Sequence, residues 1–305
     1  MSRDESSYVV VVGEALVDLV PRSDGALVPA LGGGPFNTAR ALGRLGHRTA
    51  FIGAVSRDQF GDQLAAALLD EGVLLDDALR TDRPTSLTMA QLDAGGSASY
   101  RFYFKGTSAE GLTSEIALAA LPSNVPALHV GSLGLVLQPL ADAVEALVGR
   151  LAGKALVMVD PNVRPSIIAD REGHAARLRR VMAQSDIVKV SDGDLEVLAP
   201  GRPPQDAARD LLALGPRLVL LTLGAKGAVA FGEFGAHVVA APVVKVVDTI
   251  GAGDTFSGAW LARWLELGRP LSDGDAVREA TEFGCRAAAW SCARQGAAPP
   301  RREQL

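Results

Sequence analysis

The sequence predicts an α/β fold in which helices cover both faces of a mostly parallel sheet. The first observation is a series of strand-length apolar runs that are rich in β-branched residues and lack polar alternation, as expected of strands buried on both faces. The second is that segments with helical spacing of apolar residues separate these runs. The third is a pair of partly alternating regions, which predicts a small second sheet with one exposed face.

The expected elements follow in chain order. Strands of the main sheet are expected at 8–13, 49–55, 127–131, 155–160, 186–190 and 217–222. Helices are expected at 58–71, 139–151, 171–182 and 205–214, and the run 243–247 has the composition of a further strand. The small sheet is expected from about 16–31 and 85–107. Because we find no internal repeat and no long linker, we expect these strands to be inserted in a single domain that spans 1–305.

Composition and charge exclude several classes of protein. Of 305 residues, 30 are Lys or Arg and 35 are Asp or Glu, so the net charge of −5 argues against general nucleic-acid affinity. The two cysteines, Cys285 and Cys292, cannot build a disulfide framework or a four-cysteine zinc site. The polar start lacks the pattern of a signal peptide, and no apolar run reaches the roughly 20 residues of a membrane helix. We therefore expect a cytoplasmic protein that binds neither nucleic acid nor membranes.

A glycine-containing segment, Asp248-Thr-Ile-Gly-Ala-Gly-Asp-Thr-Phe-Ser-Gly258, leads into a helical pattern. Gly251 and Gly253 lie where a loop enters a helix, and there the amides and the helix dipole favour an anion. Asp254 follows in the first turn, where a carboxylate can take a proton from an attacking hydroxyl or can simply cap the helix. The spacing alone leaves both interpretations open. The chain has no Walker A sequence and no Gly-x-Gly-x-x-Gly after its first strand, which disfavours a P-loop and a dinucleotide site.

A second segment, Gly32-Gly-Gly-Pro-Phe-Asn-Thr-Ala-Arg-Ala-Leu-Gly-Arg-Leu-Gly46, places glycines before another helix. Gly32 and Gly33 permit close approach of the backbone to a ligand, and Asn37 offers both a donor and an acceptor. Taken alone, the same pattern fits a tight turn with small residues for helix packing.

Together the two segments resemble the two signature motifs of the PfkB family of carbohydrate kinases, whose fold is called ribokinase-like. The resemblance extends in order over nearly the whole chain, through Gly13–Asp18, Asp160–Arg164 and Thr222–Gly227. It implies an αβα sandwich with a small β-sheet lid, and transfer of the γ-phosphoryl group of ATP to a sugar hydroxyl with Mg²⁺. Asp254 matches the catalytic base of the family, and Gly251, Ala252 and Gly253 match its anion hole.

The resemblance also implies the other site residues. On the sugar side it implies Asp18, Gly32, Gly33, Asn37, Phe102 and Arg164. On the nucleotide side it implies Lys189, Asp194, Thr222, Gly224 and Gly227, with Asp194 standing where many relatives carry a glutamate. A K⁺ site, built largely from backbone carbonyls, is implied at Asp248, Ile250, Ser291, Arg294 and Gly296.

The choice of sugar depends on the lid. The stretch Tyr100-Arg-Phe-Tyr-Phe-Lys-Gly-Thr107 resembles the aromatic strand of fructokinases, and no basic cluster is devoted to a second phosphate. Unphosphorylated fructose is therefore the expected substrate. A 2-keto-3-deoxygluconate kinase, with Arg101 or Lys105 on the acid, and a ribokinase are the alternatives. A non-catalytic sugar- or nucleotide-responsive protein and a dehydrogenase are alternatives of other classes. In many members of the family the lid also forms a dimer interface, which implies a homodimer here.

Overall fold

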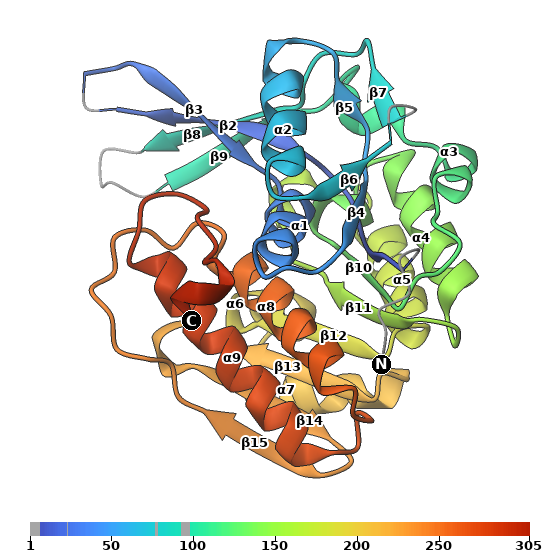
Figure 1. The fold of residues 1–305 in the computed structure, drawn as a ribbon, viewed down its shortest axis with the longest axis vertical. Coiled ribbons are helices and arrows are strands. Elements are labelled where there is room, and N and C mark those ends of the chain that lie inside the picture. The colour runs from blue at the N-terminus through green and yellow to red at the C-terminus, as the bar shows by residue number, and fades with distance from the viewer. Residues whose placement is uncertain (1–6, 23, 77–78, 93–97) are drawn as a thin grey trace.

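Nine strands form the main sheet of the computed structural model, which describes residues 7–22, 24–76, 79–92 and 98–305 (Figure 1). Strands β14 and β15 are antiparallel to their neighbours, and the others are parallel. In sheet order the strands are β15 (Gly235–Val239), β14 (Ala228–Gly232), β13 (Leu218–Thr222), β12 (Ile187–Ser191), β11 (Leu156–Asp160), β10 (Ala127–Gly131), β1 (Val9–Val12), β4 (Thr49–Ile52) and β6 (Val73–Leu75).

The apolar runs explain why the central strands form. The four valines of β1 are 3% exposed or less, because helices cover both faces of the sheet. The six strands expected for the main sheet are confirmed, whereas the β14–β15 hairpin and β6 were not predicted. The expected strand at 243–247 is wrong: this segment forms no strand. Its valines are exposed, Val243 fully so at 102%, and β-branched residues favour a strand only where neighbours pack on them.

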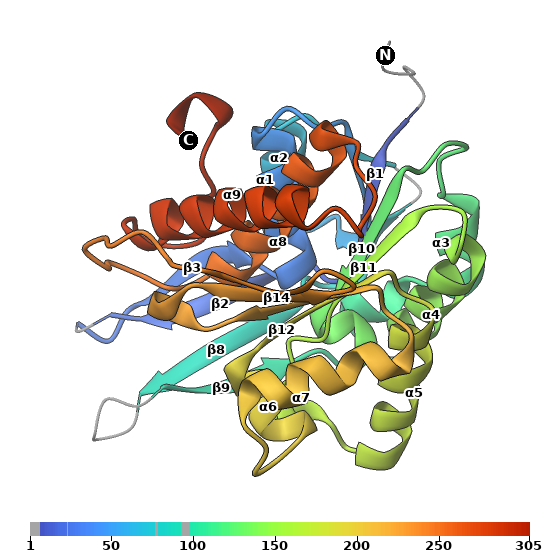
Figure 2. The same cartoon turned by 90° about the horizontal axis from the view of Figure 1, so that it is seen from below.

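Helices lie on both faces of the sheet (Figure 2). One face carries α1 (Gly34–Arg44), α2 (Gln59–Leu69), α8 (Ala252–Leu267) and α9 (Gly274–Cys292). The other carries α3 (Ser114–Ala119), α4 (Leu140–Leu151), α5 (Arg171–Ala183), α6 (Asp192–Leu198) and α7 (Pro204–Asp210). The four expected helices are found, but α7 ends early and continues as a 3₁₀ turn at Leu211–Leu214. Among the described residues, no helix is both long and apolar enough to cross a membrane.

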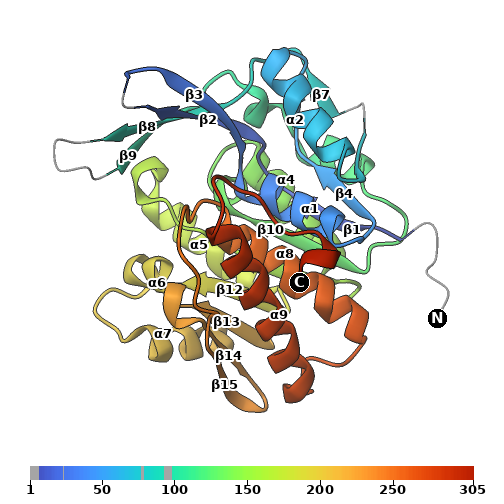
Figure 3. The ribbon, with the colours of Figure 1, turned by 60° about the vertical axis from the view of Figure 1, so that its left-hand side comes forward.

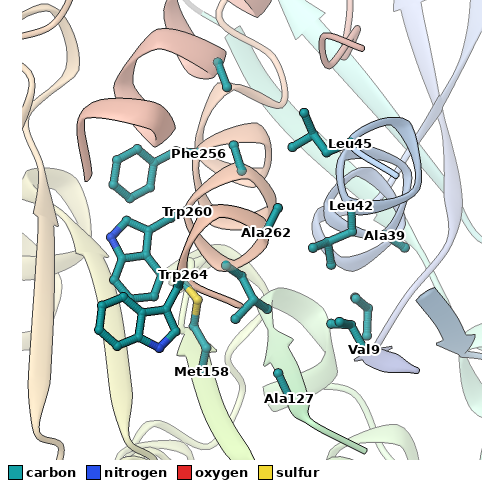
Figure 4. Packing of buried hydrophobic residues seen from close by; sticks show 14 of the residues in the cluster. Val9, Ala39, Leu42, Leu45, Ala127, Met158, Phe256, Trp260, Ala262 and Trp264 are labelled. Carbon is teal, nitrogen blue, oxygen red and sulfur yellow. The ribbon is translucent and has the colours of Figure 1, made fainter. Parts of the chain in front are cut away.

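The core under α8 is large and closely packed (Figure 4). Trp260 and Trp264 stack with ring centroids 5.3 Å apart. The buried indole of Trp260 donates a hydrogen bond to Thr281 Oγ1 on α9 at 3.1 Å. Gly258 lets α8 approach α1, since a Cβ there would lie 2.8 Å from the side chain of Ala41. This close approach packs the first half of α8 against the second half of α1.

A second, four-stranded sheet extends from the body in the order β3-β2-β8-β9 (Figure 3). Its strands are β2 (Leu16–Pro21), β3 (Leu27–Gly32), β8 (Leu87–Leu92) and β9 (Ala98–Tyr103), which confirms the expected small sheet. Phe104 packs with Leu16 and Leu133 and so attaches this sheet to the body. Other apolar side chains of the sheet are exposed, including Leu27 at 47% and Tyr103 at 49%. Two short strands, β5 (Val55–Ser56) and β7 (Arg80–Thr81), pair beside it.

Candidate active site

We call the glycine-containing turn before α8 the anion-binding turn, after the role that the sequence predicts for it. Gly251 is the N-cap of α8 and has φ 72, a left-handed conformation that favours glycine. A Cβ on Gly251 would also lie 2.6 Å from the Cβ of Ala297. The first amides of a helix have no acceptor within the helix, and the helix dipole adds partial positive charge there. The amide of Ala252 donates to the backbone oxygen of Thr249 at 3.2 Å, and anion binding by the turn at Gly251, Ala252 and Gly253 stays a prediction.

Asp254 lies in the first turn of α8 and points to another element. Its Oδ2 accepts a hydrogen bond from Asn37 Nδ2 of α1 at 2.9 Å, although the two residues are 217 positions apart in the sequence. No side chain caps α8, so the structure does not support a cap role for Asp254. Burial raises the pKa of Asp254 to about 7, and the hydrogen bond from Asn37 opposes this rise. A carboxyl group with such a pKa is suited to accept a proton near neutral pH.

The glycines before α1 allow two close contacts. A Cβ on Gly32 would lie 2.4 Å from Asp18 Oδ2, and one on Gly33 would lie 2.6 Å from the backbone oxygen of Glu14. Gly33 also has φ 111, in the region that favours glycine. The structure thus brings Gly32 and Gly33 together with Asp18 at the base of the small sheet.

Two strands of the small sheet carry Asp18 and Phe102, and Arg164 follows a strand of the main sheet. Asp18 on β2 accepts a hydrogen bond at Oδ1 from the hydroxyl of Thr88 on β8. Burial raises the pKa of Asp18, and the hydrogen bond from Thr88 opposes this rise. Phe102 on β9 lies against Phe104, with ring centroids 5.4 Å apart. Arg164, just beyond β11, is exposed, and its charge acts on Asp254.

Glu14 is a buried acid that the sequence reasoning did not single out. It follows β1 and is 3% exposed. Its carboxylate accepts hydrogen bonds from the amides of Gly34 at 3.1 Å and Gly134 at 3.2 Å. Burial raises the pKa of Glu14 to about 7. Glu14 therefore ties the start of α1 to the turn after β10; the only sequence signal was its place beside Gly13 in the opening motif.

The expected nucleotide-side acid and lysine are both buried. Asp194, at 4% exposure, accepts hydrogen bonds from the amide of Val163 at 2.7 Å and from the amide and hydroxyl of Ser191 at 2.8 and 2.7 Å. It therefore holds the 160–164 segment against α6. Lys189, at 5% exposure, forms an ion pair with Asp160 in which Nζ and Oδ2 are 2.8 Å apart. The Lys189 ammonium also lies close to the anion-binding turn, because a Cβ on Gly253 would be 3.1 Å from Nζ.

Thr222, Gly224 and Gly227 lie together at the carboxyl end of β13. Thr222 Oγ1 donates to the backbone oxygen of Val190 at 3.3 Å. Gly227 has φ 97, and a Cβ there would lie 2.0 Å from the backbone oxygen of Val239. Glycine is therefore required at 227 for packing of this loop against the end of β15.

The loops expected to hold a monovalent cation lie side by side. Asp248 Oδ2 accepts from the amide of Gly296 at 2.9 Å, and Oδ1 accepts from the amide of Ile250 at 3.0 Å. Ser291 Oγ is buried and has no hydrogen-bond partner within the described part of the chain. The guanidinium of Arg294 lies over the Trp290 ring, 3.3 Å from its centroid, so only its backbone remains for a cation. The hydroxyl of Ser291 is thus an oxygen that a hard monovalent cation could use, and the K⁺ site stays a prediction. Within the described ranges, no three His, Cys, Asp or Glu side chains are grouped as ligands of a metal ion.

Comparison with known proteins assigns the family. The model of the pfkB family of carbohydrate kinases matches residues 6–304. This chain belongs to the pfkB family. The PfkB chain is 38% identical to a fructokinase from Rhizobium leguminosarum bv. trifolii over 258 residues, which cover 83% of this chain and 78% of the relative. The family fold and carbohydrate kinase activity expected from the motifs are thereby confirmed.

Two solved structures resemble this PfkB kinase over nearly its full length. One is a fructokinase from Vibrio cholerae O395 in a form with bound fructose, ADP and calcium ion, with 30% identity, a TM-score of 0.87 and coverage of 99% of this chain and 98% of that one. The other is a fructokinase with bound ATP from Xylella fastidiosa, with 26% identity, a TM-score of 0.89 and coverage of 99% and 97%.

Proposed function

We propose that this carbohydrate kinase is an ATP-dependent fructokinase that phosphorylates a hydroxyl of unphosphorylated fructose. The observation that carries the proposal is the position of Asp254. Its carboxyl group is buried with a pKa raised to about 7, lies in the first turn of α8 and is held by Asn37 from the sugar side. The similar fructokinases support fructose as the acceptor.

On the sugar side, Asp18 and Asn37 hydrogen-bond the hydroxyls of the sugar in this proposal. Gly32 and Gly33 allow the ring to approach the backbone, and the ring of Phe102 packs against the apolar face of the sugar. Arg164, whose charge already acts on Asp254, contacts the transferred phosphoryl group.

In the reaction, Asp254 takes the proton of the sugar hydroxyl while that oxygen forms a bond to the γ-phosphorus of ATP. The bond from the γ-phosphorus to the bridging oxygen breaks, and ADP leaves. The amides of the turn at Gly251, Ala252 and Gly253 stabilise the charge on the transferred group. Asp194 would face the water molecules of a Mg²⁺ ion that arrives with ATP, and the ion would supply positive charge to the phosphates.

The nucleotide occupies the carboxyl end of β13 in this proposal. Thr222, Gly224 and Gly227 contact the phosphates and ribose. A surface hollow beyond this loop, between the 238–242 segment and α9, fits the base. Its lining is Val238, Val239, Ala240, Pro242, Glu282 and Arg286.

Three further features belong to the proposal. K⁺ bound between the loops of Asp248 and Ser291, through oxygens that include the backbone of Ile250, Arg294 and Gly296, would fix the geometry of the anion-binding turn. The exposed apolar side chains of the small sheet, such as Leu27, support a homodimer through the lid. We also propose that residues 1–305 act as one kinase domain with the lid inserted, in the cytoplasm.

The test is ADP release from MgATP with fructose, ribose, 2-keto-3-deoxygluconate, glucose, nucleosides and fructose 1-phosphate, each with and without K⁺. We expect the highest kcat/KM with fructose and stimulation by K⁺. A preference for the keto-deoxy acid would replace fructose and would assign Arg101 or Lys105 to its carboxylate. ATP binding without turnover of any of these sugars would contradict the fructokinase proposal.

A further inference from the structure

A buried ion pair lies between the main sheet and α8, outside the groups that contact substrates in the proposed reaction. Lys189 is on β12 and Asp160 is at the end of β11, with Nζ and Oδ2 2.8 Å apart and each side chain only 6% exposed. The neighbours of Lys189 on β12, Val188 and Val190, pack in the core on the opposite face of the sheet. Because side chains alternate along a strand, Lys189 faces α8.

The pair lies directly below the anion-binding turn. A Cβ on Gly253 would lie 3.1 Å from Lys189 Nζ, so the ammonium touches the backbone of that turn. One turn further along α8, the hydroxyl of Ser257 donates to Asp160 Oδ2 at 3.4 Å. Both members of the pair therefore contact the helix that carries Asp254.

Stability alone does not account for this arrangement. Two charges that are buried lose their hydration, and their mutual attraction offsets only part of this cost in free energy. Replacement of buried ion pairs by apolar residues is therefore often neutral or stabilising. The carboxylates of Asp160 and Asp194 nevertheless overcome the effect of burial and hold the pKa of Lys189 above its ordinary value. The chain thus keeps a positive charge at the point where Asp254 has to titrate, although burial also raises the pKa of its partner Asp160.

Four charged or titratable side chains face Asp254 from the surrounding elements. Burial is the main reason that its pKa is raised; Asp160 on β11 raises the pKa further, while Lys189 on β12 and Arg164 beyond β11 lower it. Glu14, after β1, is the fourth and has its own pKa raised to about 7. Lys189 and Asp160 are therefore neighbours with opposite effects on one carboxyl group.

We propose that the buried Asp160–Lys189 pair, which contacts α8 at Gly253 and Ser257 on either side of Asp254, is a positioning element that acts through the Asp254 carboxyl group. The proposal rests on the proposed function only for its catalytic consequence, which is the pH range in which Asp254 can accept the proton of the sugar. In this proposal Lys189 acts on the Asp254 carboxyl group and does not contact the nucleotide directly.

The test measures the titration of Asp254 itself. Protein labelled with ¹³C at the aspartate side-chain carboxyl is titrated by NMR, and the Asp254 signal is the one that is missing in Asp254→Asn. The label is on aspartate because Glu14 titrates in the same range and must not be detected. The variants are Lys189→Met, Asp160→Asn and the double variant, which leaves no uncompensated charge and keeps the test usable if Lys189→Met does not fold.

We expect opposite shifts from the two single variants. At pH 7 the ratio of ionised to protonated Asp254 should fall about tenfold in Lys189→Met and rise about tenfold in Asp160→Asn, the change that one pKa unit represents. The double variant should lie between them. Unchanged titration in Asp160→Asn and in the double variant, or shifts of the same sign in both single variants, would overturn the proposal.

The acid limb of the pH profile of kcat/KM separates this inference from the proposed function. If the titration of Asp254 shifts in the variants but the pH profile of kcat/KM does not, Asp254 is not the base. The inference that the pair affects the titration of Asp254 would still hold. If Asp254→Asn abolishes turnover but the titration of Asp254 is unchanged in the pair variants, the result supports Asp254 as the base. It then contradicts the proposed role of the Asp160–Lys189 pair. Glu71→Gln, which removes a different buried acid paired with Arg44 and Arg301, is the matched control and should leave the titration of Asp254 unchanged.

Discussion

Replacement of Asp254 by asparagine should make the protein more stable, and the gain should depend on pH. The change is nearly isosteric, and the Oδ1 of asparagine can still accept the hydrogen bond that Asn37 donates at 2.9 Å. It removes the carboxyl group whose pKa burial raises from 3.8 to about 7. In the unfolded chain this group ionises near its ordinary pKa, so the folded state loses stability as the pH rises from 3.8 through 7.

The magnitude follows from this difference in pKa. Each pKa unit corresponds to about 1.36 kcal/mol, so at pH 8 the carboxyl group costs at most about 4 kcal/mol. At pH 5.5 the folded group is still protonated while the unfolded one is ionised, and the cost is about 2 kcal/mol. The gain of Asp254→Asn should therefore be larger at pH 8 than at pH 5.5.

Urea unfolding of both proteins at the two pH values measures the effect. Asp82→Asn, which changes a side chain that is 98% exposed, is the matched control and should alter stability little at either pH. Lower stability of Asp254→Asn at pH 8, or an equal gain at both pH values, would refute the argument that burial raises the pKa of this carboxyl group.

Three other substitutions test separate parts of the structure. Gly227→Ala should lose at least about 2 kcal/mol in urea unfolding, because its Cβ would lie 2.0 Å from a backbone oxygen. Gly201→Ala, with φ 79 but open space around it, should lose only about 1 kcal/mol. Thr88→Val removes the hydrogen-bond donor to Asp18 and should raise the KM for fructose about tenfold with little change in kcat. Thr88→Ser keeps the hydroxyl and should keep the wild-type KM. An unchanged KM in Thr88→Val would contradict the assignment of Asp18 to the sugar site. Glu71→Gln breaks a mostly buried pairing with two arginines and should cost about 2 kcal/mol in thermal unfolding while kcat stays constant.

The main sheet was predictable because its strands carry their own signal. Runs such as Val9–Val12 can only be accommodated in the interior, where each valine is 3% exposed or less. The same reasoning failed at 243–247, because β-branched composition does not reveal whether a neighbouring strand will pair with it. The β15 strand was missed for the opposite reason: three of its five residues are exposed, so its sequence lacks a continuous apolar run.

The sequence was sufficient to predict which motifs form the candidate site, but not which of their side chains contact one another. Asn37 and Asp254 are 217 positions apart in the sequence, so no local pattern indicates that they are in contact. Only the resemblance to the family places both residues in one site. The resemblance implies that Lys189 contacts the nucleotide, and a lysine in an apolar strand gives no sign of its ion-pair partner. Its pairing with Asp160 depends on the parallel register of β11 and β12, which the sequence does not contain.

The most direct test of the account is the turnover of fructose by the wild-type chain and by Asp254→Asn, with MgATP and with binding of both substrates measured separately. We expect the wild type to release ADP with fructose, and the variant to bind fructose and ATP normally but to turn over at least about 100-fold more slowly. Near-normal turnover by Asp254→Asn would contradict the assignment of Asp254 as the base that activates the sugar hydroxyl.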